Sequence, residues 1–93
     1  MVVEKLPFIE TTLSNTKFIR DFSIAKHNEL VWHRDKEDRL IMSIEYTDWS
    51  IQLDNNIPEI IKVDTPFLIK AGVYHRLVPG KLKPPKILIE KLF

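Results

Sequence analysis

The chain has 93 residues, with 14 basic and 13 acidic side chains and no cysteine. This length fits one small domain with a single core, and the hydrophobic content of 44% argues against disorder. The balance of positive and negative charges argues against nucleic acid or an anionic membrane as a partner. The absence of cysteine from the sequence excludes a disulfide framework and thiolate chemistry. No apolar run approaches the roughly 18 residues that a membrane helix needs. The first ten residues, MVVEKLPFIE, carry acids and a proline where a signal peptide would be apolar, so we expect a cytoplasmic protein.

Short segments in which apolar and polar residues alternate follow one another along the chain. A period of two is typical of strands with one buried face. The pattern predicts strands over residues 16–24, 29–34, 40–46, 49–53, 57–63, 67–69, 72–77 and 85–93. Residues 1–16 are expected to form an N-terminal arm or an edge strand, because Pro7 and a polar run interrupt the apolar residues. About eight short strands separated by turns, with no helical period, predict an all-β sandwich or small barrel.

The alternation also assigns faces to these strands. In the first full strand one face carries Phe18, Arg20, Phe22 and Ile24. Of these, Phe22 and Ile24 are expected to face the core. In residues 40–46 one face carries Ile41, Ser43 and Glu45, and the other carries Leu40, Met42, Ile44 and Tyr46. Trp49, Ile51 and Leu53 are expected in the core, and the charged stretch 36–39 is expected to be a turn or the mouth of a site.

Two of the predicted strands carry residues that can bind a metal. In the first, His33 and Asp35 project from one face, and in the second His75 shares a face with Val73 and Leu77. If the two strands lie side by side, two imidazoles and a carboxylate meet. This set suits a divalent transition metal with open coordination positions. Gly72, before the second of these strands, is expected at a turn with a positive φ.

Two motifs around these residues resemble those of the cupin family. The first cupin motif has a His-x-His pair followed by a glutamate, and here it reads His33-Arg34-Asp35-Lys36-Glu37-Asp38. The second has Pro-x-Gly-x-x-His, and here it reads Lys70-Ala71-Gly72-Val73-Tyr74-His75. Asp35 therefore replaces a histidine and Lys70 replaces a proline. The combination ELVWHRD and YHRLVPG is also similar to small uncharacterised cupin-like proteins of tailed bacteriophages.

The resemblance implies a cupin-type jelly roll, also called a double-stranded β-helix barrel, in one domain with its barrel over residues 17–93. It implies a divalent metal ion (Fe, Mn, Ni or Zn) held by His33, Asp35 and His75. The family's further glutamate ligand would be Glu37 if the strand continues unbroken, or Asp38 if it bends. A small-molecule enzyme is then expected, one that catalyses Fe- or Mn-dependent oxidation, isomerisation or hydrolysis. A 2-oxoglutarate-dependent reaction would need a basic residue after His75, for which Lys86 is the candidate.

Other interpretations of the same residues stay open. His33, Asp35 and His75 can satisfy one another by hydrogen bonding without a metal, so a metal-free cupin that binds a small ligand, or an interaction module, remains an alternative. Arg39 is a candidate for contacting an anionic substrate, and Tyr74 is a weaker candidate for catalysis.

The outer faces of the two histidine strands carry aromatic and basic residues. Trp32 and Tyr74 are expected to flank Arg34 and Arg76 there, and these arginines are expected to form salt bridges with Glu37, Asp38 or a partner chain. Together with the N-terminal apolar residues 6–9, these aromatics predict a homodimer. No nucleophile elbow, phosphate loop or dinucleotide fingerprint is present in the sequence.

Overall fold

The computed structural model describes residues 9–22 and 30–93, and within them every regular element is a β-strand. The expected core position of Ile24 lies outside the described residues. The strands are β1 (Ile9–Thr12), β2 (Lys17–Asp21), β3 (Asp38–Ser43), β4 (Ser50–Leu53), β5 (Glu59–Ile60), β6 (Phe67–Ile69), β7 (His75–Val78) and β8 (Lys86–Leu92).

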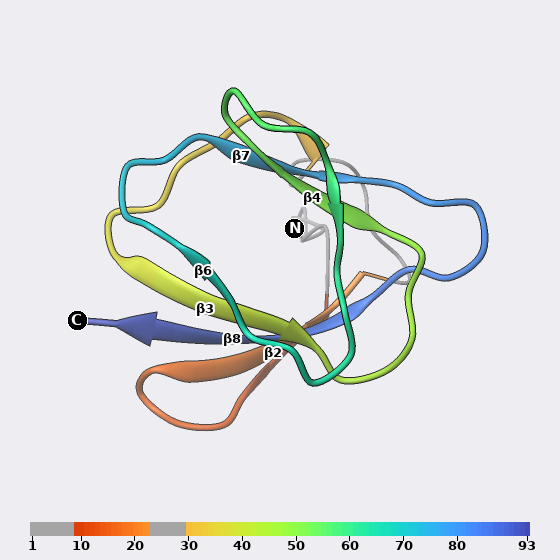
Figure 1. Cartoon of the computed structure of the whole chain (residues 1–93). Helices are drawn as coiled ribbons and strands as arrows, with labels where there is room; N and C mark the ends of the chain where they lie inside the picture. Colours follow the sequence, from red (N-terminus) through yellow and green to blue (C-terminus); the bar gives the residue numbers. More distant parts are fainter. Residues whose placement is uncertain (1–8, 23–29) are drawn as a thin grey trace, which may run out of the picture.

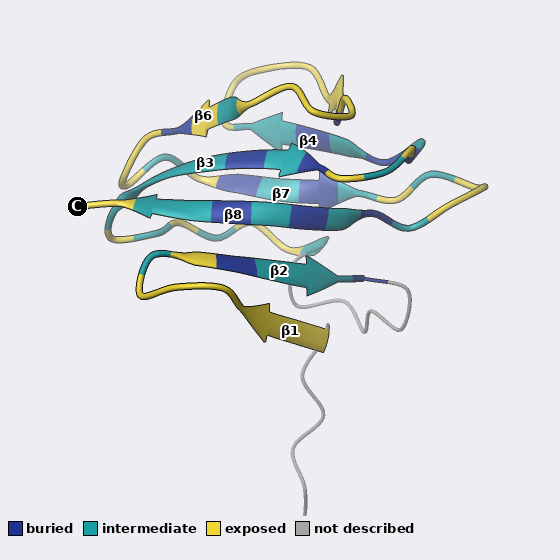
Figure 2. Cartoon of the chain, turned by 90° about the horizontal axis from the view of Figure 1, so that it is seen from below, coloured by how far each residue is buried: buried dark blue, intermediate teal, exposed yellow. Residues whose placement is uncertain are grey.

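The strands form two sheets that face each other (Figure 1). One has five strands in the order β1-β2-β8-β3-β6, and the other has three in the order β5-β4-β7. All of these pairings are antiparallel. In Figure 2 the last strand, β8, lies between β2 and β3 at the centre of the larger sheet. The prediction of an all-β protein is thus confirmed.

The described strands form two open sheets, and no closed barrel is found among them. The larger sheet ends at β1 and β6, and the smaller one ends at β5 and β7. A single isolated parallel bridge, Ser43 to Val63, links the end of β3 to the segment between β5 and β6. Of the two architectures that the strand pattern allowed, the structure therefore has the sandwich.

The core lies between the sheets and follows the predicted alternation. Ile41 and Ser43 of β3 are buried while Leu40 and Met42 are only partly so, and Phe22 is buried. The core side chains are Phe18, Phe22, Ile41, Trp49, Ile51, Ile61, Ile69, Leu77, Ile87 and Ile89. Isoleucine predominates because a β-branched side chain packs well on a pleated, buried sheet face.

Two predicted strands are reduced in the structure to two residues or to a single bridge. The segment predicted over 57–63 contributes only β5, Glu59–Ile60. The segment predicted over 29–34 makes one bridge, His33 to His75, and Glu29 lies outside the described residues. This bridge places the segment 30–35 beside β7, on the side opposite β4. A single bridge replaces a ladder here, because the chain bends at Lys36 and Glu37 to enter β3 in the other sheet.

Candidate metal centre

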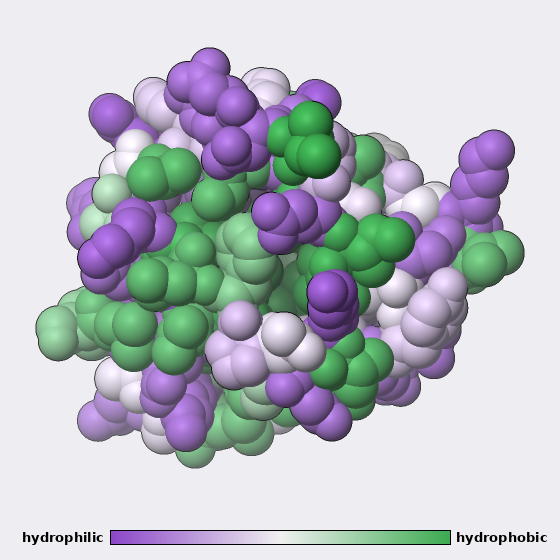
Figure 3. Space-filling view, viewed as in Figure 1, coloured by the Kyte–Doolittle hydropathy of each residue, from purple (hydrophilic) through white to green (hydrophobic). Residues whose placement is uncertain are grey.

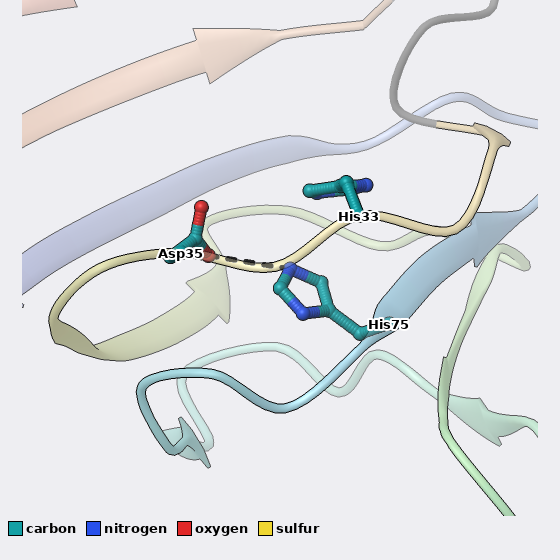
Figure 4. A group of neighbouring side chains, drawn as sticks. All are labelled: His33, Asp35 and His75. Atoms are coloured by element: carbon teal, nitrogen blue, oxygen red, sulfur yellow. Dashed lines mark ion pairs between the residues drawn. The ribbon is translucent and has the colours of Figure 1, made fainter.

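His33 and His75 lie directly opposite each other in an antiparallel bridge. The His33 amide donates to the His75 carbonyl at 3.0 Å, and the His75 amide donates to the His33 carbonyl at 2.8 Å. Two residues further on, the Asp35 carbonyl accepts from the Gly72 amide at 2.9 Å. These backbone bonds fix both histidines and Asp35 at the inner side of the sheet. Figure 4 shows the three side chains turned toward one another.

The donor atoms of these three residues converge. The two imidazole ring centroids are 4.3 Å apart, with the ring planes inclined by 61°. His75 Nε2 lies 3.3 Å from Asp35 Oδ2. One donor atom from each residue lies within 4.8 Å of the other two. At metal bond lengths of about 2.0–2.2 Å, donor atoms at tetrahedral or octahedral angles on one ion lie about 3–3.5 Å apart, so seating an ion needs side-chain shifts on the order of an ångström.

Backbone contacts define the tautomers of both rings. His33 Nδ1 lies 2.9 Å from the carbonyl oxygen of Val31, and His75 Nδ1 lies 2.9 Å from the carbonyl oxygen of Val73. A carbonyl only accepts hydrogen bonds, so each Nδ1 must carry the proton and donate it. Each neutral ring therefore keeps the lone pair on Nε2. Metal-binding histidines are usually held in this way by a partner on the other ring nitrogen.

Asp35 is the negatively charged member of the group. Burial of its side chain raises its pKa, but the hydrogen bond with His75 and the charges of Arg39, His75 and His33 outweigh that effect and hold the pKa below the ordinary value of 3.8. Arg39 Nη1 lies 3.4 Å from Asp35 Oδ1. Asp35 is thus a carboxylate at neutral pH. Asp35 Oδ2 and the lone pair of His75 Nε2 are both hydrogen-bond acceptors, and they face each other. A proton or a cation between them is needed to make this contact favourable.

Neither expected fourth ligand joins the group. Glu37 Oε1 accepts from Arg39 Nη2 at 3.1 Å and lies 3.8 Å from Lys91 Nζ. Asp38 Oδ1 accepts from the Ala71 amide at 2.8 Å, and its Oδ2 lies 3.6 Å from Lys70 Nζ. The bend at residues 36–37 carries both carboxylates away from the histidines, and the close donor group found among the described residues has only three members.

A small cavity opens beside the candidate ligands, between the two sheets. Its volume is about 40 Å³, and His33, Asp35 and His75 contribute to its wall together with Arg39. Pockets for drug-sized ligands measure roughly 300–1,000 Å³, so this cavity suits an ion with water molecules or a ligand of few atoms. Arg39, the candidate for contacting an anionic substrate, lies in this wall. Tyr74 does not line the cavity.

The residues that alternate with the candidate ligands form an array on the outer face. Arg76 lies over the Trp32 ring with Cζ 4.8 Å from the ring centroid, and Arg34 lies over the Tyr74 ring at 5.2 Å. Arg76 Nε also donates to Gln52 Oε1 at 3.0 Å. The expected flanking of the arginines by aromatics is therefore observed. The expected salt bridges to Glu37 and Asp38 are not, because those carboxylates face Arg39, Lys91 and Lys70.

The structure also places Lys86, the candidate basic residue after His75, and Arg20 relative to the cavity. Lys86 follows the buried Pro85 and precedes the buried Ile87, so it points away from the core, and its Nζ lies 3.9 Å from Glu45 Oε1. This position does not suit a contact in the cavity. Arg20, which the sequence analysis did not single out, does line the cavity. Its signal in the sequence was its place between Phe18 and Phe22 on one face of a strand.

Comparison with known proteins gives a fold relationship and no family. No family model matches the chain, and no curated protein matches it. The crystal structure of protein NMB1881 from Neisseria meningitidis is similar, with a TM-score of 0.61 and 14% sequence identity over 98% of this chain and 89% of that one. This identity supports a shared fold alone. Within residues 9–22 and 30–93, no helix has the length and apolarity for crossing a membrane.

Proposed function

We propose that this chain is a small cupin that binds one divalent metal ion through His33, Asp35 and His75. The observation that carries the proposal is that both Nδ1 atoms are occupied by backbone carbonyls, which leaves two Nε2 lone pairs to join the Asp35 carboxylate. Two neutral imidazoles and one carboxylate are the donor set of non-haem iron sites, and they also suit Mn, Ni and Zn.

The order of the strands supports a cupin-type jelly roll. When the segment 30–35 is counted as the neighbour of β7, the chain from β2 to β8 places β2, β3, β6 and β8 in one sheet and 30–35, β4, β5 and β7 in the other. A jelly roll made of two Greek keys has such a division of its strands.

We propose small-molecule catalysis as the role of the site: Fe- or Mn-dependent oxidation, or metal-assisted isomerisation or hydrolysis. A metal held by three protein donors keeps open positions at which it can polarise a substrate oxygen or activate water. In this chain, Arg39 orients Asp35 through the 3.4 Å ion pair. The isoleucines and leucine of the cavity wall limit the access of water to the bound ligand.

A metal-free, ligand-binding cupin is the second candidate. The 3.3 Å contact between His75 Nε2 and Asp35 Oδ2 favours it, because an imidazolium that donates from both nitrogens would satisfy this contact without an ion. The two candidates differ in what lies between these atoms, a metal ion or a proton.

Metal titration of the protein without a histidine tag separates them. After treatment with a chelator, calorimetric titration with Mn²⁺, Fe²⁺, Ni²⁺ and Zn²⁺ is expected to show one ion per chain for at least one metal. The affinity should fall as the pH drops through about 6–7, where free histidine titrates, because protonated imidazole has no lone pair to donate. His75→Ala is expected to weaken binding by more than about a hundredfold, since even outer contacts of a metal ligand contribute 10–100-fold.

Asp38→Asn is the matched control, because Asp38 is a nearby carboxylate bonded to Ala71 and outside the donor group. It should leave the metal affinity unchanged, whereas Asp35→Asn should lower it. Absence of binding and of any thermal shift with all four metals would favour the metal-free candidate.

A further inference from the structure

Glu37, which the resemblance to cupins implied as a metal ligand, is bonded to an arginine instead. Arg39 Nε and Nη2 both donate to Glu37 Oε1, at 3.3 and 3.1 Å. The third nitrogen of the guanidinium, Nη1, lies 3.4 Å from Asp35 Oδ1. Two carboxylates therefore share one arginine, and the contacts with Glu37 are the shorter ones.

All three of these side chains are poorly exposed. The exposed fraction is 12% for Asp35, 15% for Arg39 and 16% for Glu37. Salt screens partly buried charges less than exposed ones, and a buried charge that loses its partner is costly. The way in which Arg39 divides its contacts between the two carboxylates therefore affects the candidate metal centre, because Asp35 is one of its donors.

The pairing of β3 with β8 explains why Glu37 lies where it does. Arg39 lies directly opposite Lys91 in this pair, and like charges in opposite positions on a sheet repel each other. Glu37 Oε1 lies 3.1 Å from Arg39 Nη2 and 3.8 Å from Lys91 Nζ. The Glu37 carboxylate thus offsets the repulsion between two cations. This attraction keeps it outside the donor group.

The two oxygens of Asp35 have different neighbours. Oδ1 faces Arg39, whereas Oδ2 lies 3.3 Å from His75 Nε2, in the contact that Figure 4 draws as a dashed line. An ion bound by both His75 and Asp35 would therefore use Oδ2. A guanidinium that is free to turn binds both oxygens of a carboxylate through paired N–H donors. Such a contact of Arg39 with Asp35 would compete with the ion for Oδ2.

We propose that Glu37 is a positioning residue of the candidate metal centre, which holds Arg39 so that Asp35 Oδ2 stays available to the ion. The proposal rests on the metal site proposed above and assigns a role in it to a glutamate that does not bind the ion. The effect of Glu37 passes through Arg39. It follows that loss of the Glu37 charge weakens metal binding only while Arg39 is present.

The metal affinity of four proteins tests this dependence: the wild type, Glu37→Gln, Arg39→Gln and the variant with both changes. Each is titrated by calorimetry with Mn²⁺, Ni²⁺ and Zn²⁺. Glu37→Gln is expected to weaken binding by at least about tenfold, as is typical when an outer contact of a metal ligand is removed. In the Arg39→Gln background the same substitution should change the affinity by no more than about threefold, because the competing guanidinium is gone. Equal weakening in both backgrounds, or no weakening in the wild-type background, would overturn the proposal.

Two controls separate this role from others. Asp38→Asn removes one negative charge from the neighbouring residue, whose carboxylate is bonded to Ala71, and should leave the affinity within about threefold of wild type. A loss as large as that of Glu37→Gln would mean that only the overall charge matters, which would overturn the proposal. The visible absorption of bound Co²⁺ reports its ligands and should be the same in Arg39→Gln and the double variant. A shift between these two would identify Glu37 as a ligand and would also overturn it.

A measurement on the metal-free protein makes failure of the metal proposal distinguishable from failure of this one. Urea denaturation compares the wild type with Asp35→Asn, Glu37→Gln and the variant with both changes. With either carboxylate removed, Arg39 keeps the other, but with both removed it is a poorly exposed charge without either carboxylate. The double variant is therefore expected to lose more stability than the sum of the single losses. If the wild type binds no metal, this excess loss would still support the sharing of Arg39, whereas additive losses would overturn the inference in either case.

Discussion

Gly72 has a left-handed backbone conformation immediately beside the candidate site, with φ at 78°. An added Cβ would meet no atom within 4 Å, so the conformation alone explains the requirement for glycine. The Gly72 amide bonds the Asp35 carbonyl at 2.9 Å. The turn therefore holds the backbone of a proposed ligand, and the positive φ expected from the sequence is confirmed.

Gly72→Val is expected to lower the free energy of unfolding by more than about 1 kcal/mol, since a β-branched residue is strained at positive φ. Gly72→Asn serves as the control, because asparagine tolerates the left-handed region, and it should cost clearly less. Urea denaturation of the three proteins measures this. Equal stability of the valine variant and the wild type would show that the turn does not depend on its φ.

Individual site residues were predictable only where alternation alone placed them. His33, Asp35 and His75 follow from a period of two in adjacent strands, and the structure brings them together. The positions of Glu37 and Asp38 depend on where the chain leaves the strand, which is set by the pairing of β3 with β8 and β6. Such pairing arises from contacts distant in sequence, so no local pattern indicated that both carboxylates would be turned toward other partners.

The connection between β7 and β8 is held by a short segment that precedes β4. Asp48 Oδ2 accepts from the amides of Lys81 at 2.6 Å and Leu82 at 2.8 Å, and its Oδ1 accepts from the Lys83 amide at 2.9 Å. A Cβ on Gly80 would overlap the Asp48 carboxyl group. The Asp48 carboxylate thus accepts hydrogen bonds from three successive backbone amides. It lies so close to residue 80 that only glycine fits there.

Asp48→Asn is expected to make the free energy of unfolding less dependent on pH in the acidic range. The hydrogen bond from the Lys83 amide has the largest effect on the pKa of Asp48, and it lowers that pKa. Burial raises the pKa, but the amides of Leu82 and Lys81 lower it further. The pKa of Asp48 therefore lies below 3.8. A carboxylate with a lowered pKa in the folded state stabilises the fold above its unfolded pKa, and this stabilisation disappears as the pH falls through the folded value. The difference in unfolding free energy between wild type and variant should therefore be constant near neutral pH and shrink below about pH 4. Denaturant titrations across this range measure it, and a difference that persists at pH 2 would contradict the assignment.

Strand positions and inner faces could be predicted from the sequence, but the assignment of strands to sheets could not. The burial of Ile41, Ser43, Trp49 and Ile51 follows from alternation, which is a local property of each strand. The insertion of β8 between β2 and β3 joins segments from the two ends of the chain. This arrangement results from competition among long-range pairings, and an alternating segment such as 86–92 carries no information about its partner.

The whole molecule presents apolar side chains that suit an interface. Trp32 and Tyr74 are each 42% exposed on the outer face behind the candidate ligands. Figure 3 shows that apolar groups also reach the surface elsewhere on the molecule, on the side drawn in Figure 1. Aromatic residues and arginine are enriched at protein interfaces, which favours the outer array for self-association.

We predict a homodimer through this outer face. Sedimentation at micromolar concentration should give twice the mass of one chain, which is 11.0 kDa. Trp32→Ser is expected to shift the protein to the monomer, whereas Leu82→Ser, at a residue 77% exposed in a different loop, should not. A wild-type protein that sediments only at 11.0 kDa would rule out this assembly.

The bridge between His33 and His75 has a consequence for how this protein can change during evolution. Trp32 and Arg34 flank His33, and Tyr74 and Arg76 flank His75, so the metal donors and the outer array share the same stretches of backbone. Inserting or deleting one residue within either stretch would exchange the two faces, carrying the rings of the array inward and an imidazole outward. The metal donors and the outer array can therefore change during evolution only by substitution. Insertions and deletions must occur in the loops outside these two stretches.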